Sequence, residues 1–364
     1  MSISLGFVEP VDPTDPLIPD LHSFPDKVGG LPLWLAPIPM KSDSAKCGVC
    51  EKIMPLLLQM YTPEDNSVDA FHRVVYVFCC KNGSCHKTSW KKAIKVFRSQ
   101  LPEDNPYYDL EARNVPMCFV CGMDGTKRCA KCQVARYCSR EHQLVHWNQG
   151  GHKQQCPRIA KGESIDNDQI SADWLAKVVF PEYELVSEAE PDPKTHRYED
   201  DDKVKQLMDG AAIEEADPDE VDEDSKVDVD KAFLKFQKRL MIEPEQVVRY
   251  NRNAEGEVPP PLWGSDMGKP TDAEVGLCLH CGGKREFEFQ VMPQLLNYIE
   301  NDHSATDSLD WGTLLVFSCT QNCQPKDMTY IEEFVWRQDF TENGWGDSLR
   351  KGQGEPPKQP SEEN

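Results

Sequence analysis

The sequence of 364 residues lacks the apolar run of about 18 residues that a membrane-spanning helix needs. Its N-terminus, residues 1–9, has neither the charged region nor the apolar core of a secretory signal. It also contains no glycine-rich cofactor loop, no nucleophile elbow and no metal-ligand set with an obvious open position. We therefore expect neither a membrane protein nor a secreted protein nor an enzyme. These absences favour a cytoplasmic protein, with entry into the nucleus left open.

Cysteine, in contrast, is abundant, with 15 residues, and in an intracellular chain paired cysteines are typical of metal sites rather than disulfides. Between residues 118 and 156, two Cys-x2-Cys pairs are followed by Cys-x3-His and His-x3-Cys. A segment of roughly forty residues cannot bury enough apolar surface to fold alone, whereas bound zinc supplies that stability. The spacing predicts two tetrahedral, structural Zn²⁺ sites whose eight ligands are Cys118, Cys121, Cys129, Cys132, Cys138, His142, His152 and Cys156.

A second signal is an internal repeat, whose landmarks recur in the same order at an offset that drifts only from 229 to 239 residues. Such a long period indicates a duplicated domain rather than a solenoid. In the first copy the landmarks are Pro32-Leu33-Trp34, Cys47, Cys50, Phe78, Cys80, Cys85 and Val96-Phe97-Arg98. In the second copy they are Pro261-Leu262-Trp263, Cys278, Cys281, Phe317, Cys319, Cys323 and Val335-Trp336-Arg337.

The repeat also sorts the remaining cysteines. Cys79 aligns with Ser318, which is not a usual zinc ligand, so Cys79 is interpreted as a small core residue. Two further zinc sites of four thiolates each are predicted, Cys47, Cys50, Cys80 and Cys85 in the first copy and Cys278, Cys281, Cys319 and Cys323 in the second. The alternative, buried free thiols with some ligands lost, remains open.

The fold class is predicted to be α+β and β-rich, because short runs of β-branched and aromatic residues lead into the cysteine pairs at 73–78 and 312–317. Partner strands are expected at 93–97 and 333–337, a half-exposed strand at 287–291, and an amphipathic helix at 230–242. Residues 188–230 carry 18 acidic and 5 basic side chains, a net charge of −13, and few large apolar residues. Such a segment is expected to be disordered, either as a solvated spacer or as an arm for a basic partner.

These observations divide the chain into five parts. They are a first β-rich copy (1–112), a zinc finger (117–156), an acidic and largely disordered linker (159–229), a second copy (230–347) and a disordered tail (348–364). Each copy is expected to be a zinc-ribbon-like β domain, in which a small sheet brings two cysteine pairs together.

The residues around the finger's ligands, Tyr137-Cys138-Ser139, Glu141, Gln143, Trp147 and His152-Lys153, resemble those of the MYND finger. In that family the ligands cross-brace. The resemblance implies one site from Cys118, Cys121, Cys138 and His142, and another from Cys129, Cys132, His152 and Cys156. Many such fingers have cysteine where His142 stands, and His146, one turn further on, is an alternative ligand. We favour His142, because Cys138 and His142 at i, i+4 share a helix face.

The chain as a whole resembles the programmed cell death protein 2 family, most specifically in residues 28–34, 69–73, 118–156, 247–250 and 287–298. The resemblance implies a dedicated chaperone that captures newly made ribosomal protein S2 and supports 40S subunit biogenesis. Some members lack the finger, which implies that the duplicated domains hold the client. A net charge of −22 suits a basic client and disfavours direct nucleic-acid binding. The alternative is a transcriptional or corepressor adaptor whose finger binds proline-rich peptides.

Overall fold

The structure of the protein is a computed structural model that describes residues 3–12, 17, 24–64, 67–107, 115–163, 173–191, 230–251, 260–301, 305–324 and 330–340. The chain divides into two compact units, each described by itself below. The larger unit comprises Met1–Glu190, Glu245–Pro261 and Pro270–Arg337, and the smaller comprises Pro191–Pro244, Leu262–Lys269 and Gln338–Asn364. Among the described residues, no helix is both long and apolar enough to cross a membrane. The tail predicted at 348–364 lies outside the described residues.

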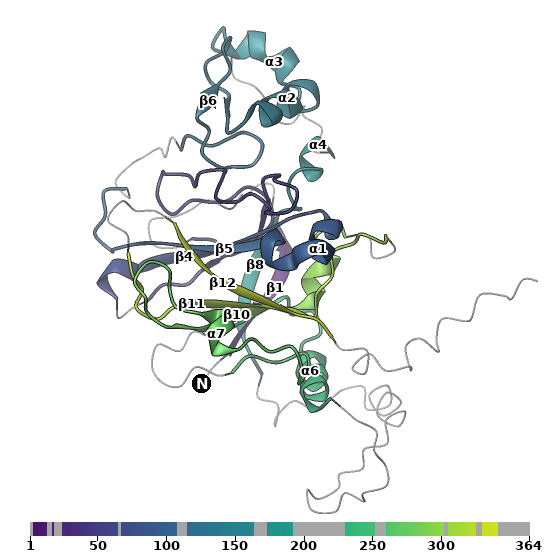
Figure 1. Cartoon of the computed structure of the whole chain (residues 1–364). Coiled ribbons are helices and arrows are strands. Elements are labelled where there is room, and N and C mark those ends of the chain that lie inside the picture. The colour runs from purple at the N-terminus through teal and green to yellow at the C-terminus, as the bar shows by residue number, and fades with distance from the viewer. Residues whose placement is uncertain are drawn as a thin grey trace, which may run out of the picture. The chain divides into compact units, whose positions relative to one another are not determined.

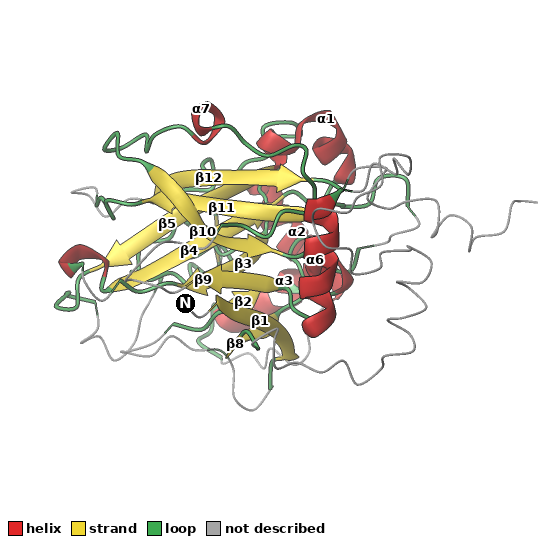
Figure 2. Ribbon diagram, turned by 90° about the horizontal axis from the view of Figure 1, so that it is seen from below, coloured by secondary structure: helices red, strands yellow, loops and turns green. Residues whose placement is uncertain are grey.

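Within the described part of the chain, ten strands form a closed barrel in the order β1-β8-β2-β3-β4-β5-β12-β11-β10-β9 (Figures 1 and 2). Strands β9 and β1 pair antiparallel and complete the ring. The strands are β1 (Ile3–Pro10), β2 (Lys27–Val28), β3 (Leu56–Tyr61), β4 (His72–Cys79), β5 (Ile94–Leu101), β8 (Tyr183–Ala189), β9 (Val248–Asn251), β10 (Arg285–Val291), β11 (Thr313–Cys319) and β12 (Ile331–Gln338). Shorter elements connect them, namely η1 (Val68–Ala70), α1 (Gly83–Ala93), α7 (Asp272–Val275) and η3 (Pro293–Asn297).

The β-rich class and the strands predicted at 73–78, 93–97, 312–317 and 333–337 are confirmed, and the strands of the two copies join in one closed barrel. They meet where β5 of the first copy pairs antiparallel with β12 of the second, Ile331 opposite Arg98 and Glu333 opposite Val96. Figure 1 shows this as blue strands beside yellow and green ones. The physical reason is that either copy alone would end in unpaired edge strands, which pairing between the copies removes.

Side chains from all around the ring gather in one apolar cluster that fills the barrel, among them Val28, Leu58, Val75, Val96, Leu185, Val248, Phe289 and Val316. Buried ion pairs lie within the same barrel and again join the two copies. Arg73 of β4 forms a bidentate pair with Glu288 of β10 and also donates to the Ser318 hydroxyl at 3.0 Å. Arg98 of β5 pairs with Glu333 of β12 at 2.8 Å.

The predicted linker is interrupted by barrel structure. Strand β8 lies within residues 159–229 and pairs with β1 from Ser4 opposite Ala189 to Pro10 opposite Tyr183. It follows α4 (Asp173–Ala176). Strand β8 has no strong apolar pattern: it contains Glu184, Ser187 and Glu188, and only Leu185 of its seven residues is fully buried. Its stability comes from pairing with residues that are distant in the sequence. Residues 192–229, which carry most of the acidic charge, lie outside the described residues.

The finger consists of the two-stranded sheet β6 (Lys127–Arg128) and β7 (Arg136–Tyr137) with helices α2 (Arg140–Asn148) and α3 (His152–Ile159). Trp34 joins it to the barrel: its indole N–H donates to the Gly122 carbonyl at 2.7 Å, while its ring packs against Tyr76 of β4 and Tyr330. Gly122 has a φ of 72°, and a Cβ there would come within 2.6 Å of Pro32. The finger and the outer face of the first copy thus share one continuous apolar core.

The smaller unit contains α6 (Lys231–Ile242), which confirms the helix predicted at 230–242. Asp230 caps its N-terminus by accepting from the backbone N–H of Phe233 at 3.1 Å. The apolar face of the helix presents Phe233 and Phe236, whose rings pack edge-on against Phe340. This contact is the core of the described part of that unit.

Candidate metal centres

Fourteen of the fifteen cysteines, with two histidines, form four clusters in which the ligand atoms all lie within 4.8 Å of one another. The clusters are Cys47, Cys50, Cys80, Cys85; Cys118, Cys121, Cys138, His142; Cys129, Cys132, His152, Cys156; and Cys278, Cys281, Cys319, Cys323. These are the four ligand sets that spacing, repeat and family resemblance indicated. The cross-brace is present, because each finger cluster takes ligands from both halves of the finger. All four clusters can hold a metal ion.

The first finger cluster is built from two tight turns and one helix end. The backbone N–H of Gly122 donates to the Cys118 carbonyl at 2.9 Å, which closes the turn that carries Cys118 and Cys121. Cys138 follows β7, and His142 lies in the first turn of α2, whose N-cap is Ser139. The Nδ1 atom of His142 lies 3.3 Å from the sulfur of Cys138 and 3.6 Å from that of Cys118.

The alternative ligand, His146, is placed elsewhere. Its Nδ1 lies 2.9 Å from the Tyr137 hydroxyl, and its ring stacks on those of Phe119, His152 and Trp174. The two histidines also differ in their pKa values. Burial opposes the charged form of His142, but its hydrogen bonds to the sulfurs of Cys118 and Cys138 outweigh this effect and raise its pKa to about 10. Burial, helped by the nearby His152, lowers the pKa of His146 to about 4.

The second finger cluster joins a turn to a helix. The Cys129–Cys132 turn is closed by a hydrogen bond from the backbone N–H of Gln133 to the Cys129 carbonyl at 3.0 Å. His152 and Cys156 are four residues apart on α3, so both side chains lie on one face of that helix. The sulfurs of Cys129 and Cys156 are 3.6 Å apart, and His152 Nε2 is 3.7 Å from the sulfur of Cys132.

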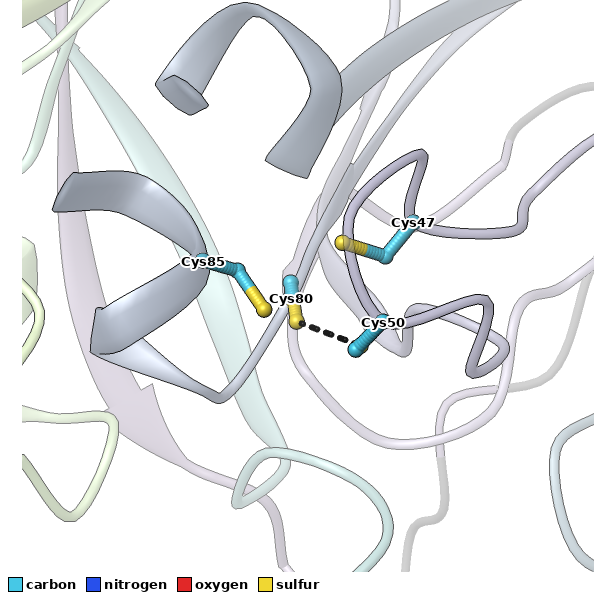
Figure 3. Close-up of side chains that lie close together, drawn as sticks. All are labelled: Cys47, Cys50, Cys80 and Cys85. Carbon is cyan, nitrogen blue, oxygen red and sulfur yellow. Dashed lines mark hydrogen bonds between the residues drawn. The ribbon is translucent and has the colours of Figure 1, made fainter. Parts of the chain in front are cut away.

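The cluster of the first copy lies where β4 ends and α1 begins. Figure 3 shows Cys47 and Cys50 on one loop, facing Cys80 just after β4 and Cys85 in the first turn of α1. The sulfurs of Cys50 and Cys80 are 3.8 Å apart. The neighbouring Cys79 is fully buried and outside the cluster, as expected for a small core residue. Burial raises its pKa, so the thiol stays protonated.

The cluster of the second copy is more open to solvent, because Cys281 is exposed and Cys323 half-buried. Its sulfur–sulfur distances are 3.6 Å for Cys278 to Cys323 and 3.5 Å for Cys281 to Cys319. Sequence reasoning missed a residue of the first copy that reaches this cluster. The Arg98 guanidinium donates to the sulfur of Cys323 at 3.6 Å and to its carbonyl at 3.2 Å. Only its place in the repeated Val-Phe-Arg landmark could have drawn attention to it.

The geometry of the four clusters fits zinc. Four ligand sulfurs at about 2.3 Å from a tetrahedral ion would lie about 3.8 Å from one another. The closest sulfur–sulfur distances, from 3.5 to 3.8 Å, approach this value. They are far longer than a disulfide bond of about 2.05 Å. Thiolate and imidazole donors in sets of four are also the ligands of structural zinc rather than of calcium or magnesium.

The finger also carries a shallow hollow on the outer side of α2. Its volume is about 350 Å³, and it is lined by Arg140, Glu141, Leu144, Val145, Asn148 and Gln149. The lining combines two apolar side chains with charged and amide groups. Leu144 is 47% exposed, and it lies in this hollow.

Three family models match this chain, and together they cover most of the described residues. The family models for the N-terminal domain of programmed cell death protein 2, the MYND finger, and the C-terminal putative domain of programmed cell death protein 2 match residues 2–115, 118–156 and 230–339. No solved structure gives a significant match.

Full-length relatives agree with these matches. The chain is 39% identical to programmed cell death protein 2 of Bos taurus, over 88% of this chain and 92% of the relative, and 37% identical to that of Rattus norvegicus, over 94% and 98%. It is 24% identical to the Schizosaccharomyces pombe protein named probable 20S rRNA accumulation protein 4, over 88% and 92%. The order of the matched domains and the identity to full-length relatives show that the chain belongs to the programmed cell death protein 2 family.

Proposed function

We propose that the protein is a zinc-binding chaperone that captures newly made ribosomal protein S2 and so supports biogenesis of the 40S ribosomal subunit. The observation that carries this proposal is the similarity, along most of both chains, to a fission yeast protein whose name refers to accumulation of a ribosomal RNA. The proposed site of action is the cytoplasm, where ribosomal proteins are made, with entry into the nucleus.

The charge of the chain supports a basic client. The formal net charge is −22. Newly made ribosomal proteins expose basic surfaces meant for RNA phosphates, and an acidic protein attracts such surfaces while it repels RNA. Attraction of this kind accelerates association and weakens as salt is added, because the Debye length falls to about 8 Å at physiological ionic strength.

The metals in this proposal are four structural Zn²⁺ ions, two in the finger and one in each copy. Each would be held by four protein side chains, so no position is left for a substrate or a reactive water. A bound ion would neutralise thiolates that otherwise repel one another at 3.5–3.8 Å. The ions thus fix the turns and helix ends, and we propose no catalytic activity.

A second candidate function is favoured by the hollow on α2. Its apolar side chains Leu144 and Val145 could receive a short extended segment, and peptides rich in proline enter such sites at a low entropic cost. This would make the finger an adaptor for proline-rich partners. It is compatible with the chaperone function, because the hollow and the duplicated copies are different surfaces.

The test is affinity purification of the tagged full-length protein from its own cells at moderate salt, with co-purifying proteins identified by mass spectrometry. We expect near-stoichiometric ribosomal protein S2 without mature ribosomes or ribosomal RNA, and a yield that falls as the salt concentration rises. Proline-rich regulators without S2 would refute the chaperone function and favour the adaptor. A Leu144→Ser variant should lose only partners that bind the finger.

A further inference from the structure

The two copies differ at the turn that carries the first cysteine pair of each cluster. In the first copy this turn is covered: the backbone N–H of Gly48 donates to the Lys92 carbonyl at the end of α1 at 2.8 Å. A Cβ at Gly48 would lie 3.1 Å from the Cβ of Lys92, so this turn packs closely against the end of α1. The neighbouring Val49 packs against the apolar core.

In the second copy the same turn projects two leucines into solvent. Leu279, which occupies the position of Gly48, is 83% exposed, and Leu277 is 58% exposed. No helix follows Cys319 in the described residues 320–324 and 330–331, where the first copy has α1. The described part of the second copy therefore holds no counterpart of the contact that covers the first turn.

The exposed turn is held rigidly. Its cluster partners Cys278 and Cys319 are buried, and the Arg285 guanidinium of β10 donates to the Val275 carbonyl at 3.3 Å. The same guanidinium donates to the Glu332 carbonyl at 3.1 Å, which ties this segment to β12. Two apolar side chains on a fixed turn lose little entropy when a partner covers them, which is typical of binding hot spots.

The surroundings of this turn are acidic. Exposed carboxylates precede it on α7, at Asp272 and Glu274, and lie on the adjoining strands β10 and β12 at Glu286 and Glu332. The opposing charges among the described residues are Lys284 and Lys91, and the ammonium group of Lys91 pairs with Glu274 at 3.6 Å and lies over the Trp336 ring at 4.5 Å. That pair is neutral as a whole, so Asp272, Glu286 and Glu332 remain against Lys284. An apolar centre with a net acidic rim complements a basic segment that carries apolar side chains.

We propose that Leu277 and Leu279, with their acidic rim, form the surface that binds the basic client of the chaperone. This inference rests on the proposed function and assigns the client to one turn of the second copy. The leucines would cover apolar side chains of the newly made ribosomal protein, and the carboxylates would face the lysines and arginines on either side of them.

The experiment is co-expression of ribosomal protein S2 with the full-length chain or with the double variant Leu277→Ser, Leu279→Ser, followed by affinity capture. The matched control is Val68→Ser, because Val68 of the first copy is 84% exposed and lies far from this turn in the sequence. We expect the double variant to retain its zinc content and thermal stability but to capture S2 at least about tenfold more weakly. The control should capture S2 as well as the unchanged chain does.

Each other outcome overturns a defined part of the reasoning. If the unchanged chain captures no S2, the proposed function fails, and this inference with it. If the unchanged chain and the double variant capture S2 equally, the function stands but the assignment to this turn is wrong. If the double variant keeps S2 but loses self-association, the turn binds a second copy of the chain, which also refutes the inference.

Discussion

The contact of Trp34 with the finger yields a quantitative prediction. The Trp34 side chain is 3% exposed, lies against Tyr76 and Tyr330, and donates to the Gly122 carbonyl at 2.7 Å. Removing a buried tryptophan ring in favour of alanine costs about 3–5 kcal/mol. Its hydrogen bond contributes about 1 kcal/mol, and an unpaired buried carbonyl costs a similar amount again. Losses measured for such substitutions already include contributions of this kind, so we expect Trp34→Ala to lower the free energy of unfolding by about 4 kcal/mol, the middle of the range of about 3–5 kcal/mol.

Trp34→Phe separates the two contributions. It keeps most of the ring contact but removes the indole N–H, so a loss of about 1–2 kcal/mol is expected. The assay is urea unfolding of the zinc-loaded protein, followed by far-ultraviolet circular dichroism for the barrel and by release of zinc to a chelating dye for the finger. Because Gly122 directly follows a ligand of the first finger cluster, both signals should shift together in the alanine variant.

Two results would refute this reasoning. A Trp34→Ala variant within 1 kcal/mol of the unchanged chain would mean that the shared core does not couple the finger to the barrel, since that change is well below the expected range. A large shift in zinc release with no shift in the dichroism signal would show that the finger unfolds independently. The surface variant Val68→Ser, at a site 84% exposed, controls for general effects of substitution.

Three further predictions concern the barrel and its candidate metal sites. Burial opposes ionisation of Glu288, but the positive charge of Arg73 outweighs this effect and holds the pKa of Glu288 below its ordinary value of 4.5. The ion pair therefore stabilises the folded state above pH 4.5, and this contribution is lost as the pH falls through the lowered pKa. Glu288→Gln leaves Arg73 buried without its charged partner, so the free energy of unfolding in urea should fall by about 3–5 kcal/mol at neutral pH. The stability of the variant should also depend less on acid than that of the unchanged chain, and an unaltered unfolding midpoint would contradict this prediction. The Arg98→Lys variant should release zinc from the cluster of the second copy about tenfold faster in a chelator competition, because lysine cannot reproduce the paired contacts with Cys323 and Glu333. Equal release rates would exclude a role for Arg98 in holding that metal. Elemental analysis should find four zinc ions per chain and three in Cys281→Ser, and a count of two in the unchanged chain would restrict the metal to the finger.

The ligand sets are predictable from the sequence because the cysteine spacings that define them are short or recur in the internal repeat. Cys-x2-Cys pairs fix two donors on one turn, and the repeat decides between Cys79 and Cys80. The strand at 287–291 shows where such reasoning fails. Its alternation predicts that Glu288 faces solvent, yet β10 bulges between Phe287 and Phe289, and Glu288 turns into the barrel to meet Arg73. A bulge of one residue changes the face of every later side chain, and the partner of the inward-facing Glu288 lies 215 positions away in the sequence.

The closure of the barrel could not be predicted from the sequence either, for a different reason. Its first strand, β1, and the strand β8 from the expected linker contain few buried side chains, so neither has a strong apolar pattern. Each is stabilised by the other, over the pairs from Ser4–Ala189 to Pro10–Tyr183. Composition alone favours disorder for acidic residues such as those of β8. Tertiary pairing overrides that tendency, because β strands take much of their stability from neighbours that are remote in the sequence.

The arginines at the end of the repeated Val-x-Arg landmark suggest why two copies remain in one chain. Arg98 of the first copy contacts Cys323 in the cluster of the second. Arg337 is its counterpart in the second copy, at the offset of 239. Burial raises the pKa of Cys79 and lowers that of His86, and the positive charge of Arg337 lowers the pKa of both groups. The first copy thus supplies a cation to the cluster of the second, whereas Arg337 of the second copy acts on Cys79 and His86, which neighbour the ligands Cys80 and Cys85 in the sequence. A four-thiolate zinc site would carry a net charge of about −2, so we expect Arg98 to stabilise the site of the second copy, a contact that exists only because the two copies share one barrel.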